Sequence, residues 1–172
     1  MSYPDPRYPD PGYPERRYLG DTGEVSAAIR RADDPAELRT TTGHCHYLAT
    51  SASTNGHFGL YRWEMGPEPS GPGPHFHRTM SESFYVLSGI VHIYDGTQWV
   101  QTRPGDFAFV PEGGIHGFRN ESGAEASMLI LFAPGAPREA YFEGLMEIAN
   151  RKDTPSEEEM ADFFERHDNI WV

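Results

Sequence analysis

The chain has 172 residues, a length that suits one domain with modest extensions. Hydrophobic residues make up 37% of it and aromatic residues 13%, which is typical of a globular protein rather than a disordered one. A phosphate backbone or an anionic membrane surface would repel a net charge of −12, so we expect no nucleic-acid and no membrane partner. No apolar run approaches the roughly 20 residues that span a bilayer.

Two features bear on the cellular compartment. Residues 1–6 show no basic region followed by an apolar segment, so no secretion signal is visible. Cys45 has no second cysteine to pair with, and we expect it to be a small buried apolar residue rather than a nucleophile. Together these features favour a cytoplasmic protein.

The first elements in chain order are an extension and a series of short strands. Residues 1–20 are rich in proline and tyrosine, which predicts an extended N-terminal tract. Residues 21–134 contain short apolar or alternating segments separated by Gly/Pro turns, a spacing typical of a β-sandwich or barrel. Asp95-Gly96 predicts a hairpin turn. The expected strands are 46–51, 58–65, 82–87, 90–94, 97–102, 107–110, 117–120 and 126–132.

Residues 135–172 form a C-terminal extension with a helical pattern. Apolar side chains recur at i,i+4 spacing over residues 137–150, which predicts a first helix. A second helix is expected to begin at Thr154 as the cap, with Pro155 at the first helical position and Glu157 closing a capping box.

Three histidines and one glutamate are candidate metal ligands. Alternate side chains of a strand point the same way, so His75 and His77 could hold one metal ion. Glu82 opens an apolar strand, where a buried carboxylate requires a partner such as a metal ion. His116 follows the turn at residues 111–114, on the returning strand. Each signal alone is weak, because surface or core histidines would give the same pattern.

Together these residues match the two signature motifs of the cupin superfamily, and the chain resembles that superfamily over roughly residues 44–133. The first motif, Gly-(x)5-His-x-His-(x)4-Glu-(x)6-Gly, is matched by His75, His77, Glu82 and Gly89, with Pro69 in place of the opening glycine. The second, Gly-(x)5-Pro-x-Gly-(x)2-His-(x)3-Asn, is matched at every specified position by Gly105, Pro111, Gly113, His116 and Asn120.

The resemblance implies an all-β fold, the antiparallel cupin jelly roll or double-stranded β-helix, with a metal ion inside one mouth. It implies that His75, His77, Glu82 and His116 bind one divalent metal ion. Three imidazoles and one carboxylate suit Fe, Mn, Ni, Co, Cu or Zn, and disfavour Ca and Mg. Four ligands leave two positions on an octahedral ion, for a bidentate substrate or for one substrate oxygen plus dioxygen. Glu82 is also a candidate catalytic base.

Strand alternation around the candidate ligands predicts which side chains face a substrate cavity. Some of these side chains are expected to belong only to the core. A lining of this kind suits an apolar or planar aromatic substrate. The candidate substrate-binding residues are Tyr61, Trp63, Phe84, Val86, Phe118, Met128, Ile130 and Phe132.

Within the superfamily, the chain resembles the bacterial quercetin dioxygenase-like cupins, on Phe132-Ala133-Pro134-Gly135 followed by a helix with Phe142-Glu143. This resemblance implies a dioxygenase acting on a small hydroxylated aromatic or enol compound, flavonol-like or polyketide-like. One alternative is a polyketide cyclase or isomerase that uses the metal as a Lewis acid without dioxygen. Another is a non-catalytic cupin that binds or senses a small molecule, because fold alone does not fix function. We also expect a homodimer, since exposed sheet edges need cover.

Overall fold

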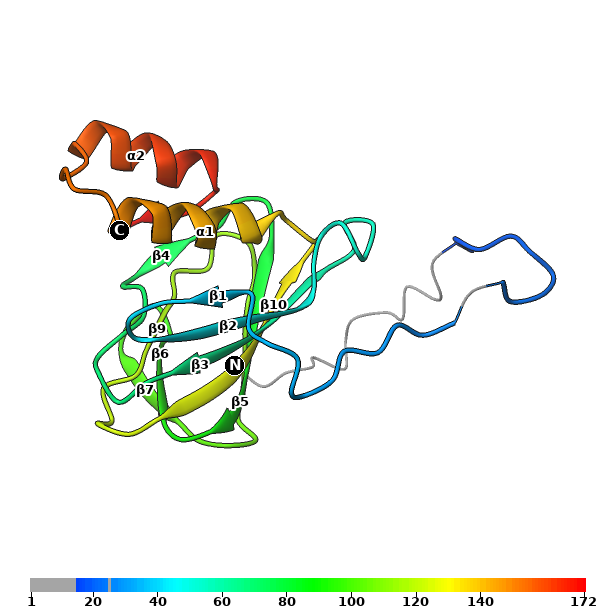
Figure 1. The fold of residues 1–172 in the computed structure, drawn as a ribbon, viewed down its shortest axis with the longest axis horizontal. Helices are drawn as coiled ribbons and strands as arrows, with labels where there is room; N and C mark the ends of the chain where they lie inside the picture. Colours follow the sequence, from blue (N-terminus) through cyan, green and yellow to red (C-terminus); the bar gives the residue numbers. More distant parts are fainter. Residues whose placement is uncertain (1–14, 25) are drawn as a thin grey trace. The chain divides into compact units, whose positions relative to one another are not determined.

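The computed structural model describes residues 15–24 and 26–172. The chain divides into two compact units, residues 1–31 and residues 32–172. Most of the expected extension over residues 1–20 lies outside the described residues, and the described part of the first unit contains no helix or strand. The second unit holds all the strands and helices that follow (Figure 1).

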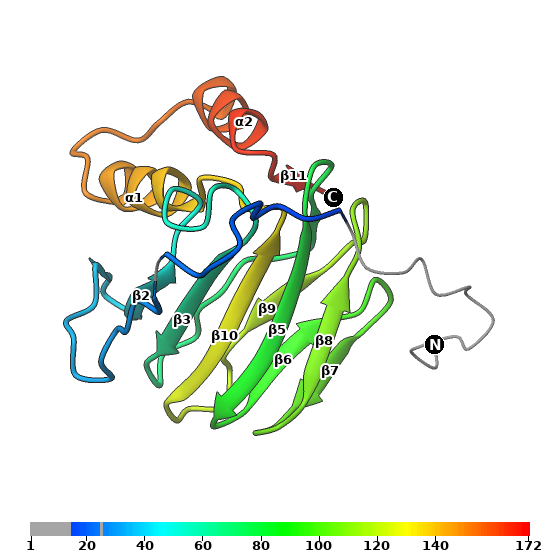
Figure 2. The same ribbon diagram turned by 90° about the vertical axis from the view of Figure 1, so that its right-hand side faces the viewer.

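Two antiparallel sheets form the body of the second unit, and Figure 2 shows the smaller sheet behind the larger one. The larger sheet contains, in spatial order, β1 (Leu38–Arg39), β2 (Gly43–Ala49), β3 (Gly59–Met65), β10 (Ala126–Ala133), β5 (Ser81–Ser88) and β8 (Phe107–Val110). The smaller sheet contains β7 (Trp99–Thr102), β6 (Val91–Tyr94) and β9 (Gly117–Arg119). All eight strands expected from the sequence are present, with small shifts at their ends.

A third pairing joins two very short strands, β4 (His75–Phe76) and β11 (Ile170–Trp171). It brings the end of the chain against a segment almost a hundred positions earlier. The sequence analysis did not predict β11, because two residues carry no hydrophobic period that could be recognised.

The core lies between the two sheets, and β10 shows why these sequences form strands. Alternate side chains of β10, including Met128, Ile130 and Phe132, are at most 2% exposed, whereas their neighbours are half-buried. This period of two is that of a strand with one buried face. Ile93 of β6 reaches the same core from the smaller sheet. Cys45 is fully buried, as expected, and burial raises the pKa of its thiol.

The predicted hairpin at Asp95-Gly96 joins β6 and β7. Asp95 Oδ1 accepts hydrogen bonds from the backbone N–H groups of Thr97 and Gln98, both at 2.9 Å. Gly96 has φ +94°, a conformation that costs glycine little. The local sequence alone therefore determines this turn.

Two helices follow the sheets, α1 (Arg138–Ala149) and α2 (Glu157–Arg166), and both lie beyond one end of the sheets (Figure 2). Tyr141 of α1 and Phe163 of α2 stack with 5.7 Å between ring centroids and 21° between ring planes. No helix in the described part of the chain has the length and apolar character needed to cross a bilayer.

The predicted cap of α2 is wrong by two residues. The cap is Ser156, whose side chain accepts a hydrogen bond from the backbone N–H of Glu159 at 3.1 Å, and not Thr154. The sequence offers two overlapping Ser/Thr-x-x-Glu patterns here, and α2 uses the second. Pro155 therefore precedes the cap instead of opening the helix.

Candidate metal centre

Four buried side chains meet at one point between the sheets. They are His75, His77, Glu82 and His116, the four residues expected from the motifs. Each is at most 3% exposed, and their ligand atoms lie within 4.8 Å of one another. The structure thus brings the whole predicted ligand set together.

Backbone pairing positions these side chains. His75 and His116 form an antiparallel bridge, in which the N–H of His75 donates to the carbonyl of His116 at 2.8 Å and the reverse bond measures 2.9 Å. Residues directly opposite in such a pair present their side chains on the same face. His77 lies two residues beyond His75, and Glu82 is the second residue of the neighbouring strand β5.

Each imidazole donates its Nδ1 hydrogen to a backbone carbonyl oxygen. A carbonyl oxygen can only accept, so a neutral ring in this position presents the lone pair of Nε2 to the centre of the cluster. This is the tautomer that binds a metal ion through Nε2. The bonds run from His75 to Gly73 (2.9 Å), from His116 to Gly114 (2.9 Å) and from His77 to Asp168 (2.5 Å).

The short distances at the centre of the cluster need a shared proton or a metal ion. Nε2 of His77 lies 3.0 Å from Oε2 of Glu82, and Nε2 of His116 lies 2.7 Å from the same oxygen. With Nδ1 carrying the hydrogen, two lone pairs would face a carboxylate oxygen, which is repulsive unless a proton or a metal ion lies between them. Three nitrogen donors and one carboxylate suit a divalent transition metal, so these residues fit such an ion.

Burial and mutual contacts shift the pKa values of three of the ligands, Glu82, His75 and His116. Burial alone would raise the pKa of Glu82, but the close contacts with His116 and His77 outweigh it and hold the pKa below its usual range. Burial lowers the pKa of His75 to about 4. Burial would also lower the pKa of His116, but the contact with Glu82 raises it overall, so a proton competes with a metal ion at His116.

Asp168 connects the end of the chain to the cluster. Its carbonyl orients His77, and its carboxylate accepts hydrogen bonds from the backbone N–H groups of Arg78 and Thr79 and from the hydroxyl of Thr79, at 2.7–3.0 Å. Its φ of +52° is uncommon for a residue other than glycine. The sequence analysis missed Asp168, because no motif marks a contact made across 91 positions.

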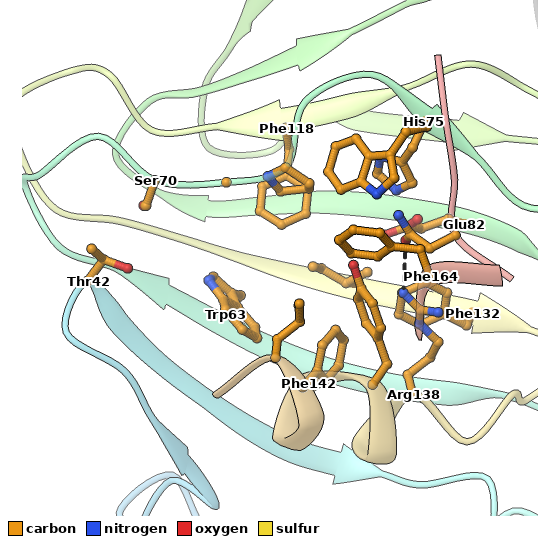
Figure 3. A pocket seen from close by; sticks show the side chains of 17 residues that line it. Thr42, Trp63, Ser70, His75, Glu82, Phe118, Phe132, Arg138, Phe142 and Phe164 are labelled. Atoms are coloured by element: carbon orange, nitrogen blue, oxygen red, sulfur yellow. Dashed lines mark hydrogen bonds between the residues drawn. The ribbon is translucent and has the colours of Figure 1, made fainter. Parts of the chain in front are cut away.

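A cavity of about 330 Å³ adjoins the cluster, with His75 and Glu82 in its wall. Figure 3 shows these two residues at one end of the cavity and Thr42 at the other. Most of the remaining wall is apolar or aromatic. Most of the lining residues that the sequence analysis did not include belong to the C-terminal segment. These are Arg138, Tyr141, Phe142, Leu145, Phe164, Asn169 and Trp171.

The eight candidate substrate-binding residues separate into two groups. Trp63, Phe118, Ile130 and Phe132 line the cavity. Tyr61, Phe84, Val86 and Met128 are at most 2% exposed and belong to the core around it. Strand alternation predicts which face a side chain takes, but not how far along the strand the cavity extends. The role of all eight in substrate binding stays a prediction.

Tyr61 illustrates why the cavity ends where it does. Its hydroxyl donates to Glu139 of α1 at 2.6 Å, and its ring meets Phe142 edge-on at 5.3 Å between centroids. Helix α1 therefore covers this part of the sheet and separates Tyr61 from the cavity. The helix predicted directly after the segment that forms β10 was the available signal for such cover.

Comparison with known proteins is consistent with this site. The cupin domain family model matches residues 61–132. Quercetin 2,3-dioxygenase from Bacillus subtilis (strain 168) is 33% identical over 88 residues, which cover 51% of this chain and 26% of that protein. The chain therefore spans only about a quarter of this curated relative.

Solved structures show the same fold. A conserved protein with a double-stranded β-helix domain from Klebsiella pneumoniae has a TM-score of 0.53 and 18% identity, covering 65% of this chain and 94% of its own. The polyketide cyclase RemF from Streptomyces resistomycificus has a TM-score of 0.55 and 25% identity, covering 66% and 82%. These structures confirm the predicted double-stranded β-helix. Residues 61–132 thus match the cupin domain family, and the fold around them is the double-stranded β-helix.

Proposed function

We propose that this protein is a metal-dependent dioxygenase of the cupin type that acts on a small hydroxylated aromatic or enol compound, flavonol-like or polyketide-like. The observation that carries the proposal is the position of the four ligands, which adjoin a cavity walled largely by aromatic side chains. The 33% identity to quercetin 2,3-dioxygenase over 88 residues supports the same reaction class, and the cupin family model over residues 61–132 includes all four ligands.

The residues of the site have distinct roles in this proposal. His75, His77, Glu82 and His116 would hold one divalent transition metal ion, which when bound supplies Lewis-acid and redox chemistry that side chains lack. The apolar walls exclude water and offer flat surfaces to a planar ring. Glu82 is in addition the candidate base for a substrate hydroxyl because it lines the cavity, although its lowered pKa makes the carboxylate a weak proton acceptor.

Oxygen uptake tests the proposal. The protein would be loaded separately with Fe, Mn, Ni, Co, Cu and Zn and assayed on a panel of flavonols and catechols. We expect oxygen consumption with at least one redox-active metal and its loss in Glu82→Ala and His116→Ala. His57→Ala, which changes an exposed histidine outside the cluster, serves as the matched control. No uptake on the panel with any metal contradicts the proposal.

Two other functions make different predictions. A cyclase or isomerase, which the 25% identity to RemF favours, would convert its substrate under argon as fast as in air. A binding or sensing protein would capture a ligand that mass spectrometry recovers unchanged. Anaerobic turnover therefore separates the two enzymes, and ligand recovery separates both from a sensor.

The expected homodimer and the cytoplasmic location stay predictions. Light scattering of the full chain tests the dimer, and the same measurement without residues 1–20 tests whether the Pro/Tyr tract contributes to it. If the number of subunits is unchanged after this deletion, the tract does not contribute to the dimer interface.

A further inference from the structure

Arg138 is a buried arginine in the wall of the cavity. It is the first residue of α1 and is 3% exposed. Its guanidinium carbon lies 4.1 Å from the ring centroid of Tyr141 and 5.1 Å from that of Phe132. Nη1 donates to the carbonyl of His167 at 2.7 Å, and Nη2 makes a long contact of 3.4 Å with Oδ1 of Asn169. Figure 3 shows Arg138 on the same side of the cavity as Glu82.

The charge of Arg138 has no ion-pair partner within the described part of the chain. Burial lowers the pKa of its guanidinium, and the negative charge of Glu82 offsets part of this effect. Two buried donors beside the cavity, Nε of Arg138 and Nδ2 of Asn169, also lack an acceptor among the described residues. Buried donors without acceptors are costly, so a site built in this way calls for an oxygen acceptor from a ligand.

The formal charges point in the same direction. With neutral imidazoles, a divalent ion and the Glu82 carboxylate carry a net charge of +1, and Arg138 raises the total to +2, of which the less buried Asp168 carboxylate offsets only a part. Buried charge without compensation is unfavourable in apolar surroundings. A ligand with two acidic groups would neutralise both positive charges, with one group at the metal ion and the other at Arg138.

We propose that Arg138 and Asn169 form an anion subsite, and that the substrate is an aromatic acid whose carboxylate binds there while its hydroxyl or enol oxygen faces the metal ligands. Arginine suits this role because its planar fork can donate two parallel hydrogen bonds to a carboxylate. The hydroxyl of Tyr141 is a third donor nearby, since burial raises its pKa to about 12 and keeps it protonated. The inference deepens the proposed function and rests on its metal site, but not on oxygen consumption.

A binding experiment without turnover tests the subsite. Zinc-loaded protein under argon would be titrated with 3,4-dihydroxybenzoate and with 3,4-dihydroxybenzamide, which differ in charge but little in shape. Calorimetry would report the affinities. We expect the acid to bind about tenfold or more tightly than the amide, the size expected of hydrogen bonds to a charged group. The chain's net charge of −12 opposes the acid, so any preference must arise locally.

Variants then test whether the preference for the acid over the amide arises at Arg138 and Asn169. In Arg138→Met we expect the acid and the amide to bind within about twofold of each other. Asn169→Asp should have the same effect while keeping Arg138, because it supplies an internal carboxylate for the guanidinium. Arg119→Met is the charge-matched control and should retain the preference, since Arg119 pairs with Glu121 and lies over Trp99 outside the cavity.

The outcomes that overturn the subsite differ from those that overturn the dioxygenase. Equal affinity for acid and amide in the unaltered protein, or binding of neither, contradicts the aromatic-acid substrate. A preference that survives in Arg138→Met and Asn169→Asp contradicts the subsite. If circular dichroism shows Arg138→Met to be misfolded, Asn169→Asp alone decides. None of these outcomes bears on oxygen uptake, so the dioxygenase proposal stands or falls separately.

Discussion

The metal-binding strands and the C-terminal segment contribute to the same site in different ways. Residues 75–116 supply all four candidate ligands, and their positions follow from short-range turns and one bridge between His75 and His116. Residues 138–172 supply no ligand, yet they provide much of the cavity wall and the carbonyl that orients His77. We therefore expect the first region to control metal binding, and the second to contribute to the choice of ligand.

This difference implies that the two regions can be altered separately. Trp171 of β11 lies opposite His75 in the register of β4, with 5.4 Å between the ring centroids. The C-terminal strand thus covers the ligands from outside without joining them. Changes in the first region should abolish metal binding, whereas changes in the second should weaken it or alter ligand selection.

Removal of a ligand should have the largest effect. In Glu82→Ala we expect metal content by elemental analysis to fall from one equivalent to almost none, because the only anionic donor of the cluster is lost. Glu64→Ala, which changes a half-exposed glutamate that pairs with Arg62, is the control. Full metal content in Glu82→Ala would show that the cluster does not depend on its carboxylate.

The contacts of Asp168 with His77, Arg78 and Thr79 form what we call the C-terminal clamp. Loss of this clamp should affect metal binding less than loss of a ligand. In Asp168→Ala we expect metal affinity to fall about 10- to 100-fold, the range typical when a group that orients a ligand is disturbed. The reason is that the carboxylate holds the backbone whose carbonyl fixes the ring of His77. Asp162→Ala, on the exposed face of α2, should leave metal affinity unchanged. An Asp168→Ala protein with full affinity would mean that His77 needs no clamp.

The sequence predicted the metal-binding strands much better than the C-terminal segment. His116 was found because its motif records local geometry: Gly113 has φ +77°, and the buried amide of Asn120 donates to the carbonyls of Gly66 and Ala124. Even the departure at Pro69 has a local explanation. Gly71, two residues later, has φ +122°, and a Cβ there would lie 2.1 Å from the Phe118 carbonyl oxygen, so this turn still needs a glycine.

Arg138, Asn169 and Asp168 could not be predicted, because their roles depend on how the helices pack and not on neighbours in sequence. An arginine at the start of a helix normally lies in solvent, and the sequence gives no sign that this one is buried against Phe132 and Tyr141. Residues whose partners are distant in sequence become visible only when the fold brings them together.

Acid should loosen the C-terminal segment before the metal-binding strands unfold. Burial tends to raise the pKa of Asp168, but hydrogen bonds from Thr79 and Arg78 outweigh it and lower the pKa below its usual value. A lowered pKa means that the stabilisation is present above the unfolded-state value of about 4 and is lost as the pH falls through the folded-state value. The protection of residues 168–172 from hydrogen exchange, measured relative to the intrinsic exchange rate at each pH, should therefore fall below about pH 4. Asp168→Asn should exchange faster at neutral pH and lose this acid dependence. Uniform acceleration along the chain would contradict a local clamp.

The smallest expected effect concerns the cap of α2, the helix that leads into the clamp. Ser156→Ala removes the side chain that accepts from the N–H of Glu159, and such a loss costs about 1 kcal/mol of stability, or roughly 3 °C in the melting temperature for a chain of this size. Thr154→Ala is the matched control, since Thr154 is exposed and does not cap the helix, and its melting temperature should not change. If the two variants exchange these results, the helix begins two residues earlier in solution and Pro155 occupies its first turn. Because Phe163 of α2 stacks on Tyr141 in the cavity wall, a weaker cap should also loosen ligand binding slightly while metal content stays at one equivalent. Weaker ligand binding with unchanged metal content would show that the C-terminal segment affects the ligand without affecting the metal-binding strands.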